Sequence, residues 1–124
     1  MIDFQNGGYF KLSAIPVEQV EAELSPLMLD GERMFMAFKG LRDYVVFTDK
    51  RIIAVNAQGL RGKKRDYSSL PYKKVQAFSV ETAGTFDLDA ELELWFSGLG
   101  RVKFEFSQQT DVAYLNKLIG SYVL

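Results

Sequence analysis

Hydrophobic residues follow two different spacings along the chain. Near the N-terminus, Val17, Val20 and Leu24 recur at intervals of three and four residues, which is the spacing of one face of an α-helix. The polar side chains between them would then face water. The pattern predicts an N-terminal helical segment over residues 16–29, preceded by a leader over residues 1–15.

From residue 33 onward, aromatic and β-branched residues occur in short runs separated by turn residues, which is typical of β-strands. The runs predict strands at residues 33–39, 42–48, 51–57, 63–67, 72–82, 86–97 and 101–107. Short strands joined by tight turns favour an antiparallel meander that closes into a barrel or folds as two packed sheets.

The run over residues 86–97 alternates most regularly. Its apolar positions are Phe86, Leu88, Ala90, Leu92, Leu94 and Phe96. Most of the positions between them are acidic, so the strand has an apolar inward face and an acidic outward face. A three-residue loop after this strand would pair Leu94 with Phe104 and place Lys103 beside Trp95.

A helix over residues 108–122 is predicted at the end of the chain, with Ser107 or Thr110 as its N-cap. Its apolar stripe consists of Val112, Leu115, Leu118, Ile119 and Tyr122. The complete prediction is one domain over residues 1–124 with a mainly β fold. A seven-stranded antiparallel barrel over residues 33–107 is capped by the C-terminal helix and extended by the N-terminal helix.

Four ordered segments of this layout resemble bacterial pleckstrin-homology (PH) domains, and the resemblance extends over about residues 15–124. The segments are Tyr44 to Ile53, Gly59 to Lys64, Leu70 to Val75 and Val80 to Asp89. The resemblance implies a PH-like barrel without enzymatic activity. It also implies a tendency to assemble into closed homo-oligomeric rings.

Composition excludes several kinds of chemistry. The chain of 124 residues is 48% hydrophobic and 25% charged, as expected of a globular protein, and it contains no Cys and no His. Thiolate chemistry and the commonest general base are therefore missing, and we expect no catalytic residue, no cofactor and no metal site. The tip Thr48-Asp49-Lys50-Arg51 fits a hairpin turn better than a catalytic group.

The chain carries no signal-peptide pattern in its first ten residues, and no stretch approaches the ~20 apolar residues of a membrane span. We therefore expect a cytoplasmic location.

Charge is unevenly distributed, although the net charge is only −1. Residues 33–74 carry eleven basic and three acidic residues, a net of +8, which leaves −9 for the rest. This division suits an anionic partner or a second copy of the chain. The candidate residues for binding an anion or lipid headgroup are Lys39, Arg42, Lys63, Lys64 and Arg65. We expect no nucleic acid, because stacking aromatics are missing from this set and the pI is about 5.5.

The acidic face of the sixth predicted strand is a candidate contact surface. Its carboxylates lie about 6.8 Å apart along a strand, so they do not converge on a metal ion. The first three predicted strands are apolar on both faces, so their outer face must be covered by the N-terminal helix, by another subunit, or by both. The candidate oligomer interface consists of Phe35, Phe38, Tyr44, Val46, Asp87, Asp89, Glu91 and Glu93.

These observations favour a non-enzymatic assembly module that forms homo-oligomers, including rings. Apolar area would supply the binding energy and opposite charge would set the register. Another protein is a second potential partner. The alternative function is peripheral binding of anionic lipid headgroups at a membrane, through the basic residues named above.

Overall fold

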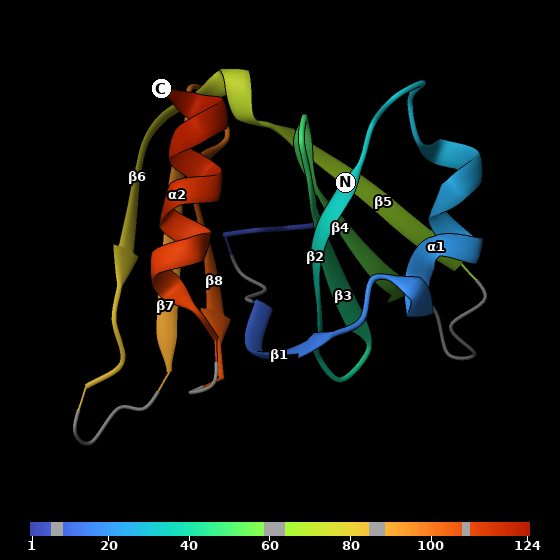
Figure 1. Ribbon diagram of the computed structural model, residues 1–124, viewed down its shortest axis with the longest axis horizontal. Coiled ribbons are helices and arrows are strands. Elements are labelled where there is room, and N and C mark those ends of the chain that lie inside the picture. Colours follow the sequence, from blue (N-terminus) through green and yellow to red (C-terminus); the bar gives the residue numbers. More distant parts are fainter. Residues whose placement is uncertain (6–8, 59–63, 85–88, 108–109) are drawn as a thin grey trace.

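The computed structural model describes residues 1–5, 9–58, 64–84, 89–107 and 110–124. Its elements in chain order are β1 (Tyr9–Ile15), α1 (Glu18–Leu24), the 3-10 turn η1 (Ser25–Leu27), β2 (Met34–Lys39), β3 (Asp43–Thr48), β4 (Arg51–Gln58), β5 (Lys64–Pro71), the 3-10 turn η2 (Tyr72–Lys74), β6 (Val75–Glu81), β7 (Ala90–Phe96), β8 (Gly100–Phe106) and α2 (Val112–Val123). Figure 1 shows two halves, one formed by β2–β5 with α1 and the other by β6–β8 with α2.

The strands form one eight-stranded sheet in the order β5-β4-β3-β2-β1-β8-β7-β6. The predicted class, mainly β with a helix near each end, is confirmed. The sheet differs from the predicted seven-stranded barrel in two ways, because it has an additional strand and it is not closed. Within the part of the chain that the structure describes, β5 and β6 end the sheet and do not pair with each other.

The additional strand is β1, which lies in the segment predicted as a leader. Its first residues run parallel to β8, and its last three pair antiparallel with β2, so that β1 joins the two halves. The register shifts between Tyr9 and Leu12, where Lys11 has a φ of +55°. This irregularity interrupts the two-residue alternation by which strands are recognised.

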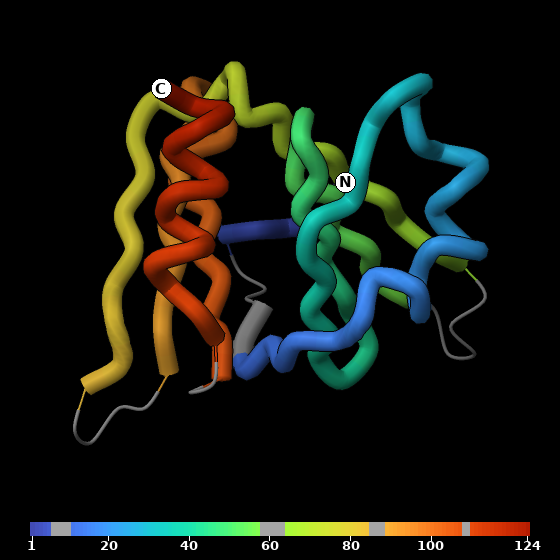
Figure 2. The backbone as a smooth tube through the Cα atoms, in the orientation of Figure 1, coloured from blue at the N-terminus to red at the C-terminus, as the bar shows by residue number. Residues whose placement is uncertain are grey.

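Residues 1–5 run between the two halves, as the dark blue tube in Figure 2 shows. The Ile2 amide donates to Ser68 Oγ in β5, and the Gln5 Nε2 group donates to the carbonyls of Leu99 and Arg101 beside β8. Phe4 is buried among the core side chains between them. The N-terminal residues therefore contribute to the core.

The N-terminal helical segment, predicted over residues 16–29, forms α1 and η1. Val20 and Leu24 are buried, and they pack with Val46 and Ile53 on the outer face of the β2–β5 half. Burying each large apolar side chain contributes about 1.5–3 kcal/mol, so this stripe is sufficient to hold a short helix on the sheet.

Helix α2 begins at a different cap from the one predicted. The Asp111 carboxylate accepts a hydrogen bond from the Tyr114 amide at 3.0 Å and is the N-cap, in place of Ser107 or Thr110. The predicted stripe is confirmed by three buried side chains, Leu115, Leu118 and Ile119. None of the helices in the described ranges has the length and apolar composition needed to cross a membrane.

The predicted pairing of β7 with β8 is wrong by two residues. Lys103 lies opposite Glu93 instead of beside Trp95, and every apolar pair shifts by the same amount. Positive φ angles at both Gly98 and Gly100 place the turn one residue earlier than predicted. A shift of two residues keeps each side chain on its face. The inward face is confirmed by four buried residues, Ala90, Leu92, Leu94 and Phe96, while Phe86 and Leu88 lie outside the described residues.

Candidate functional site

A hollow of about 610 Å³ lies between α1, the β2–β3 hairpin and the adjoining ends of β4 and β5, and we call it the hairpin hollow. Three of the five predicted anion-binding residues, Lys39, Arg42 and Arg65, line it. Lys64 is exposed at the start of β5 and does not line the hollow, whereas Lys63 lies outside the described residues. The structure therefore brings together bases from two hairpins that are distant in sequence.

Glu23 of α1 lines the hairpin hollow and contacts side chains of β3 and β5. Its carboxylate accepts hydrogen bonds from the hydroxyls of Tyr44 at 2.8 Å and Tyr67 at 2.7 Å, and it lies 3.5 Å from Arg65 Nε. Burial alone would raise the pKa of Glu23, but the two tyrosine hydroxyls and the Arg65 charge outweigh it and lower that pKa. Burial, followed by the Glu23 hydrogen bond, raises the pKa of Tyr44, so at neutral pH Glu23 is charged and Tyr44 is neutral.

The tip of the β2–β3 hairpin forms the rim of the hollow. Leu41 is 97% exposed there, and Lys39 and Arg42, on either side of it in sequence, are exposed as well. The Asp43 carboxylate accepts a hydrogen bond from Asn56 Nδ2 at 2.6 Å, which holds this acidic group against β4. The rim therefore combines one exposed apolar side chain with two bases.

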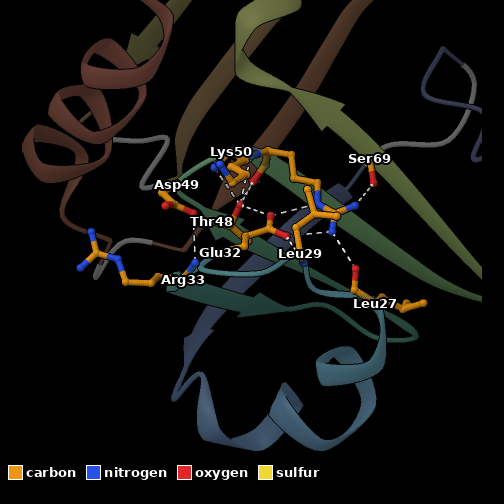
Figure 3. Close-up of polar contacts among 9 residues, drawn as sticks. Leu27, Leu29, Glu32, Arg33, Thr48, Asp49, Lys50 and Ser69 are labelled. Atoms are coloured by element: carbon orange, nitrogen blue, oxygen red, sulfur yellow. Dashed lines mark hydrogen bonds and ion pairs between the residues drawn. The ribbon is translucent and has the colours of Figure 1, made fainter.

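A buried carboxylate lies at the other end of the β2–β5 half, where Glu32 contacts the β3–β4 hairpin (Figure 3). Glu32 Oε1 lies 2.9 Å from Arg51 Nη2, and Glu32 Oε2 accepts from the Thr48 hydroxyl at 2.7 Å and from Arg51 Nε at 3.0 Å. The Leu29 amide donates to the same carboxylate, whose side chain is 0% exposed. We call Glu32, Thr48 and Arg51 the Glu32 cluster.

The Glu32 cluster fixes the connection after α1 onto the sheet. Arg51 also donates to the Leu27 carbonyl and to Ser69 Oγ, so one guanidinium joins η1 to β5. Burial opposes ionisation of Glu32, but the Arg51, Leu29 and Thr48 hydrogen bonds lower its pKa overall. The hairpin tip is a turn, as predicted, and its Thr and Arg have a structural role that the sequence did not reveal.

The predicted acidic face is largely paired within the chain. Lys103 Nζ lies 3.2 Å from Glu91 and 3.5 Å from Glu105, and Arg101 lies 3.6 Å from Glu93. Asp89 is half-buried, and Asp87 lies outside the described residues. Among the described residues, no group of three or more acidic side chains is placed to hold a metal ion.

The apolar part of the predicted interface is buried within one chain. The exposed fractions of Phe38, Tyr44 and Val46 are 1%, 8% and 0%. Tyr44 and Val46 lie under α1, and Phe38 points into the core between the halves. These three residues are not available to another subunit, so a second copy is not needed to cover them, contrary to our expectation.

Phe35, the remaining apolar candidate, is partly buried at the end of β2. Its ring stacks on Tyr122 of α2 with centroids 6.1 Å apart, and the Arg33 guanidinium carbon lies 5.3 Å from its centroid. Tyr122 stacks in turn on Tyr72, with centroids 5.6 Å apart. This aromatic row links α2 to the β2–β5 half.

The open edges of the sheet are a surface that the sequence analysis missed, because a closed barrel has no edge. Within the described residues β5 pairs only with β4, and β6 pairs only with β7. Gln76, Ala77 and Ser79 of β6 are exposed, and Glu81 is the one charged residue of that strand. An unpaired edge presents backbone donors and acceptors to another strand.

Comparisons with known proteins agree with this fold over nearly the whole chain. The sequence profile of the family described as "Bacterial PH domain" matches residues 3–123. An uncharacterized protein of Bacillus subtilis, YjqA, is 42% identical over 120 residues, which cover 95% of this chain and 96% of YjqA.

Two solved structures from Shewanella share both sequence and fold with the chain. A DUF1696 family protein with a pleckstrin-homology domain from Shewanella loihica is 43% identical with a TM-score of 0.81, covering 95% of this chain and 100% of that one. A pleckstrin homology domain from Shewanella amazonensis is 44% identical with a TM-score of 0.67, covering 96% and 93%.

Proposed function

Because the chain belongs to the bacterial PH domain family, we propose that it works as a non-enzymatic module that assembles with further copies of itself. The observation that carries the proposal is that the two edge strands, β5 and β6, pair with no further strand among the residues that the structure describes. An edge strand exposes a row of backbone N–H and C=O groups, and proteins that remain monomeric usually protect such an edge with charges, proline or a covering element.

The edge strand β6 has little of this protection. Its seven residues include Val75, Phe78 and Val80, and the one charge, Glu81, is at its end. The β5 edge is different, because it begins with the exposed bases Lys64 and Arg65. Unlike edges favour a head-to-tail contact in which β6 of one copy meets β5 of the next, and such contacts close into rings when the rotation between copies permits.

The interior between the two halves also supports a role in assembly instead of catalysis. The inward side chains are apolar and buried, among them Phe47, Leu92, Phe104 and Phe106. A substrate pocket would need polar groups converging on a space in this region. The described side chains fill it instead.

Light scattering on the purified chain, across micromolar concentrations, tests the proposal. The measured molar mass is expected to be that of a multimer. Lysine at two exposed β6 positions, Ala77→Lys with Ser79→Lys, is expected to give a monomer with unchanged circular dichroism, because charge on an edge strand opposes strand pairing. The matched control, Ala113→Lys with Asn116→Lys, adds the same charge to the exposed side of α2 and should leave the mass unchanged.

A monomeric wild-type chain at the highest concentration would refute assembly. A multimer that persists in the β6 double variant would leave assembly standing but would exclude this edge as the contact.

The hairpin hollow supports a second candidate function, the peripheral binding of anionic groups. Its volume lies within the range of ligand sites, and Lys39, Arg42 and Arg65 direct positive charge to it. Sedimentation with vesicles of phosphatidylcholine plus an anionic lipid should therefore recover the chain in the pellet, whereas phosphatidylcholine alone should not. Absence of pelleting with every anionic lipid at low salt would refute this function.

A further inference from the structure

The two edge strands belong to different halves of the molecule, so the connections between the halves set the position of one edge relative to the other. Strand β5 is part of the β2–β5 half, and strand β6 is part of the β6–β8 half. In a head-to-tail contact, the rotation between successive copies follows from the arrangement of the two edges within one copy. A ring therefore closes at one number of copies only when that arrangement is fixed.

Within the sheet the halves meet at β1, where the strand pairing is short and irregular. β1 pairs with β2 over Ser13 to Ile15 and with β8 at Tyr9 and Leu12, and the register with β8 shifts between those two residues. The ladder between β4 and β5, in contrast, extends over eight residues of each strand. A short, interrupted ladder lets two groups of strands turn relative to each other more readily than a continuous one.

Residues 1–5, which we call the N-terminal strap, cross between the halves at a place separate from β1 (Figure 2). On the β5 side, the Ile2 amide donates to Ser68 Oγ at 3.1 Å. The Ser68 hydroxyl donates its own proton to the Asp66 carboxylate at 2.6 Å. Because that proton is engaged by Asp66, the Ser68 oxygen is held as an acceptor for the strap.

On the β8 side, the strap is held by the side chain of Gln5. Its Nε2 group donates to the Leu99 carbonyl at 3.0 Å and to the Arg101 carbonyl at 2.8 Å, at the β7–β8 turn and the start of β8. Between the two attachments, Phe4 is 8% exposed in the core that both halves share. The strap therefore has a hydrogen-bonded partner in each half and a buried ring between them.

We infer that the N-terminal strap fixes the relative orientation of the two sheet halves and thereby sets the number of copies that close a ring. The second part rests on the proposed function, because copy number has a meaning only if the chain assembles. The first part is a property of the single chain. Gln5 and Ser68 act as positioning residues, since they hold the halves and leave the exposed side chains of β6 unchanged.

The test measures the distance between the halves directly. Spin labels are attached at Lys64→Cys on β5 and Gln76→Cys on β6, which are exposed positions, and the chain contains no other cysteine. Pulsed electron paramagnetic resonance gives the distribution of distances between the labels. The labelled chain is diluted with unlabelled chain so that each distance comes from one copy. The unmodified strap should give one narrow distribution.

The strap variant, Gln5→Glu with Ser68→Ala, is expected to broaden this distribution. Glutamate is similar in size to glutamine, but its ionised carboxylate has no proton to donate to the carbonyls at the start of β8. Alanine removes the acceptor of the Ile2 amide. Phe4 is kept in both copies of the comparison, so the circular dichroism spectrum should stay that of the wild type.

The matched control, Gln19→Glu with Ser121→Ala, makes the same two chemical changes at exposed positions of α1 and α2 and should leave the distance distribution as it is. Native mass spectrometry of the unlabelled chains then counts the copies. The wild type and the control should each give one copy number. The strap variant should give several, because halves that turn relative to each other allow rings of different size to close.

The outcomes separate the inference from the function on which its second part rests. An unchanged distance distribution in the strap variant would overturn the inference, whatever the oligomeric state. A broadened distribution with the wild-type copy number would overturn the effect of the strap on ring size. A monomeric wild-type chain would refute the proposed function and with it the copy number, whereas the distance measurement would still decide whether the strap holds the halves.

Discussion

Substitution of Glu32 by Ala removes the acceptor at the centre of the Glu32 cluster. The variant leaves the Arg51 guanidinium, which is 18% exposed, without its counter-charge, and it leaves the Leu29 amide without this acceptor. Removing one partner of a buried ion pair typically destabilises a protein by about 3–5 kcal/mol. Arg51 keeps its bonds to Leu27 and Ser69, so we expect the lower end of this range, about 3 kcal/mol.

That loss is large against the total stability of a domain, which is about 5–15 kcal/mol. For a chain of this length the unfolding entropy makes 1 kcal/mol equivalent to roughly 4 °C, so Glu32→Ala should lower the Tm by about 12 °C. Thermal and urea unfolding followed by circular dichroism measure the change.

Two controls accompany this prediction. Asp30→Ala removes an exposed acid from the same connection and should change the stability by less than about 0.5 kcal/mol. Glu32→Gln combined with Arg51→Met removes both charges and should cost less than Glu32→Ala alone. A Glu32→Ala effect below about 1 kcal/mol would refute the view that this cluster holds the segment after α1 on the sheet.

Three further predictions concern stability. The pKa of Glu32 is lowered in the folded chain, so its contribution to the free energy of unfolding is present above the unfolded pKa of about 4.3 and is lost as the pH falls through the folded value. In urea titrations from pH 7 to 2, the free energy of unfolding should therefore fall less steeply with pH for Glu32→Gln than for the wild type. Gly120→Ala should raise the free energy of unfolding by roughly 0.5–1 kcal/mol, because the added Cβ would lie at ordinary contact distance from the Phe78 ring, 3.8 Å, and from Leu124, 3.9 Å. A lower melting temperature for this variant would show that the helix does not accommodate the methyl group. Lys11→Val should destabilise by about 1–2 kcal/mol while Lys11→Asn does not, because Asn tolerates the positive φ; equal melting temperatures would exclude strain at this position.

The elements with unbroken periodicity could be predicted from the sequence. The helical stripe containing Val20 and Leu24 and the inward face of β7 lie where their spacing placed them. Strand β1 could not be found in this way, because the residue at φ +55°, Lys11, lies within a register shift that removes the alternation. The predicted β7–β8 register was wrong by two residues. Hydrophobic patterning does not distinguish registers that differ by an even number of residues, because each side chain stays on the same face of the sheet.

The candidate site was only partly predictable. Charge clustering found the bases of the hairpin hollow, but the acid opposite Arg65 is Glu23, which lies on the polar side of a helix and resembles a solvent-exposed residue in sequence. The apolar strands suggested an interface, yet α1 covers Tyr44 and Val46 within the same chain. Sequence patterns show that a face must be covered, but they do not show which element covers it.

The position of β1 between β2 and β8 has a consequence for biosynthesis. A ribosome delivers the N-terminus first, at about 5–20 residues per second. The strand β2 and its hairpin partners follow soon after β1, whereas β8 begins only at Gly100. We therefore expect each group of hairpins to pair locally, and the joining of the two groups through β1 to follow that local pairing.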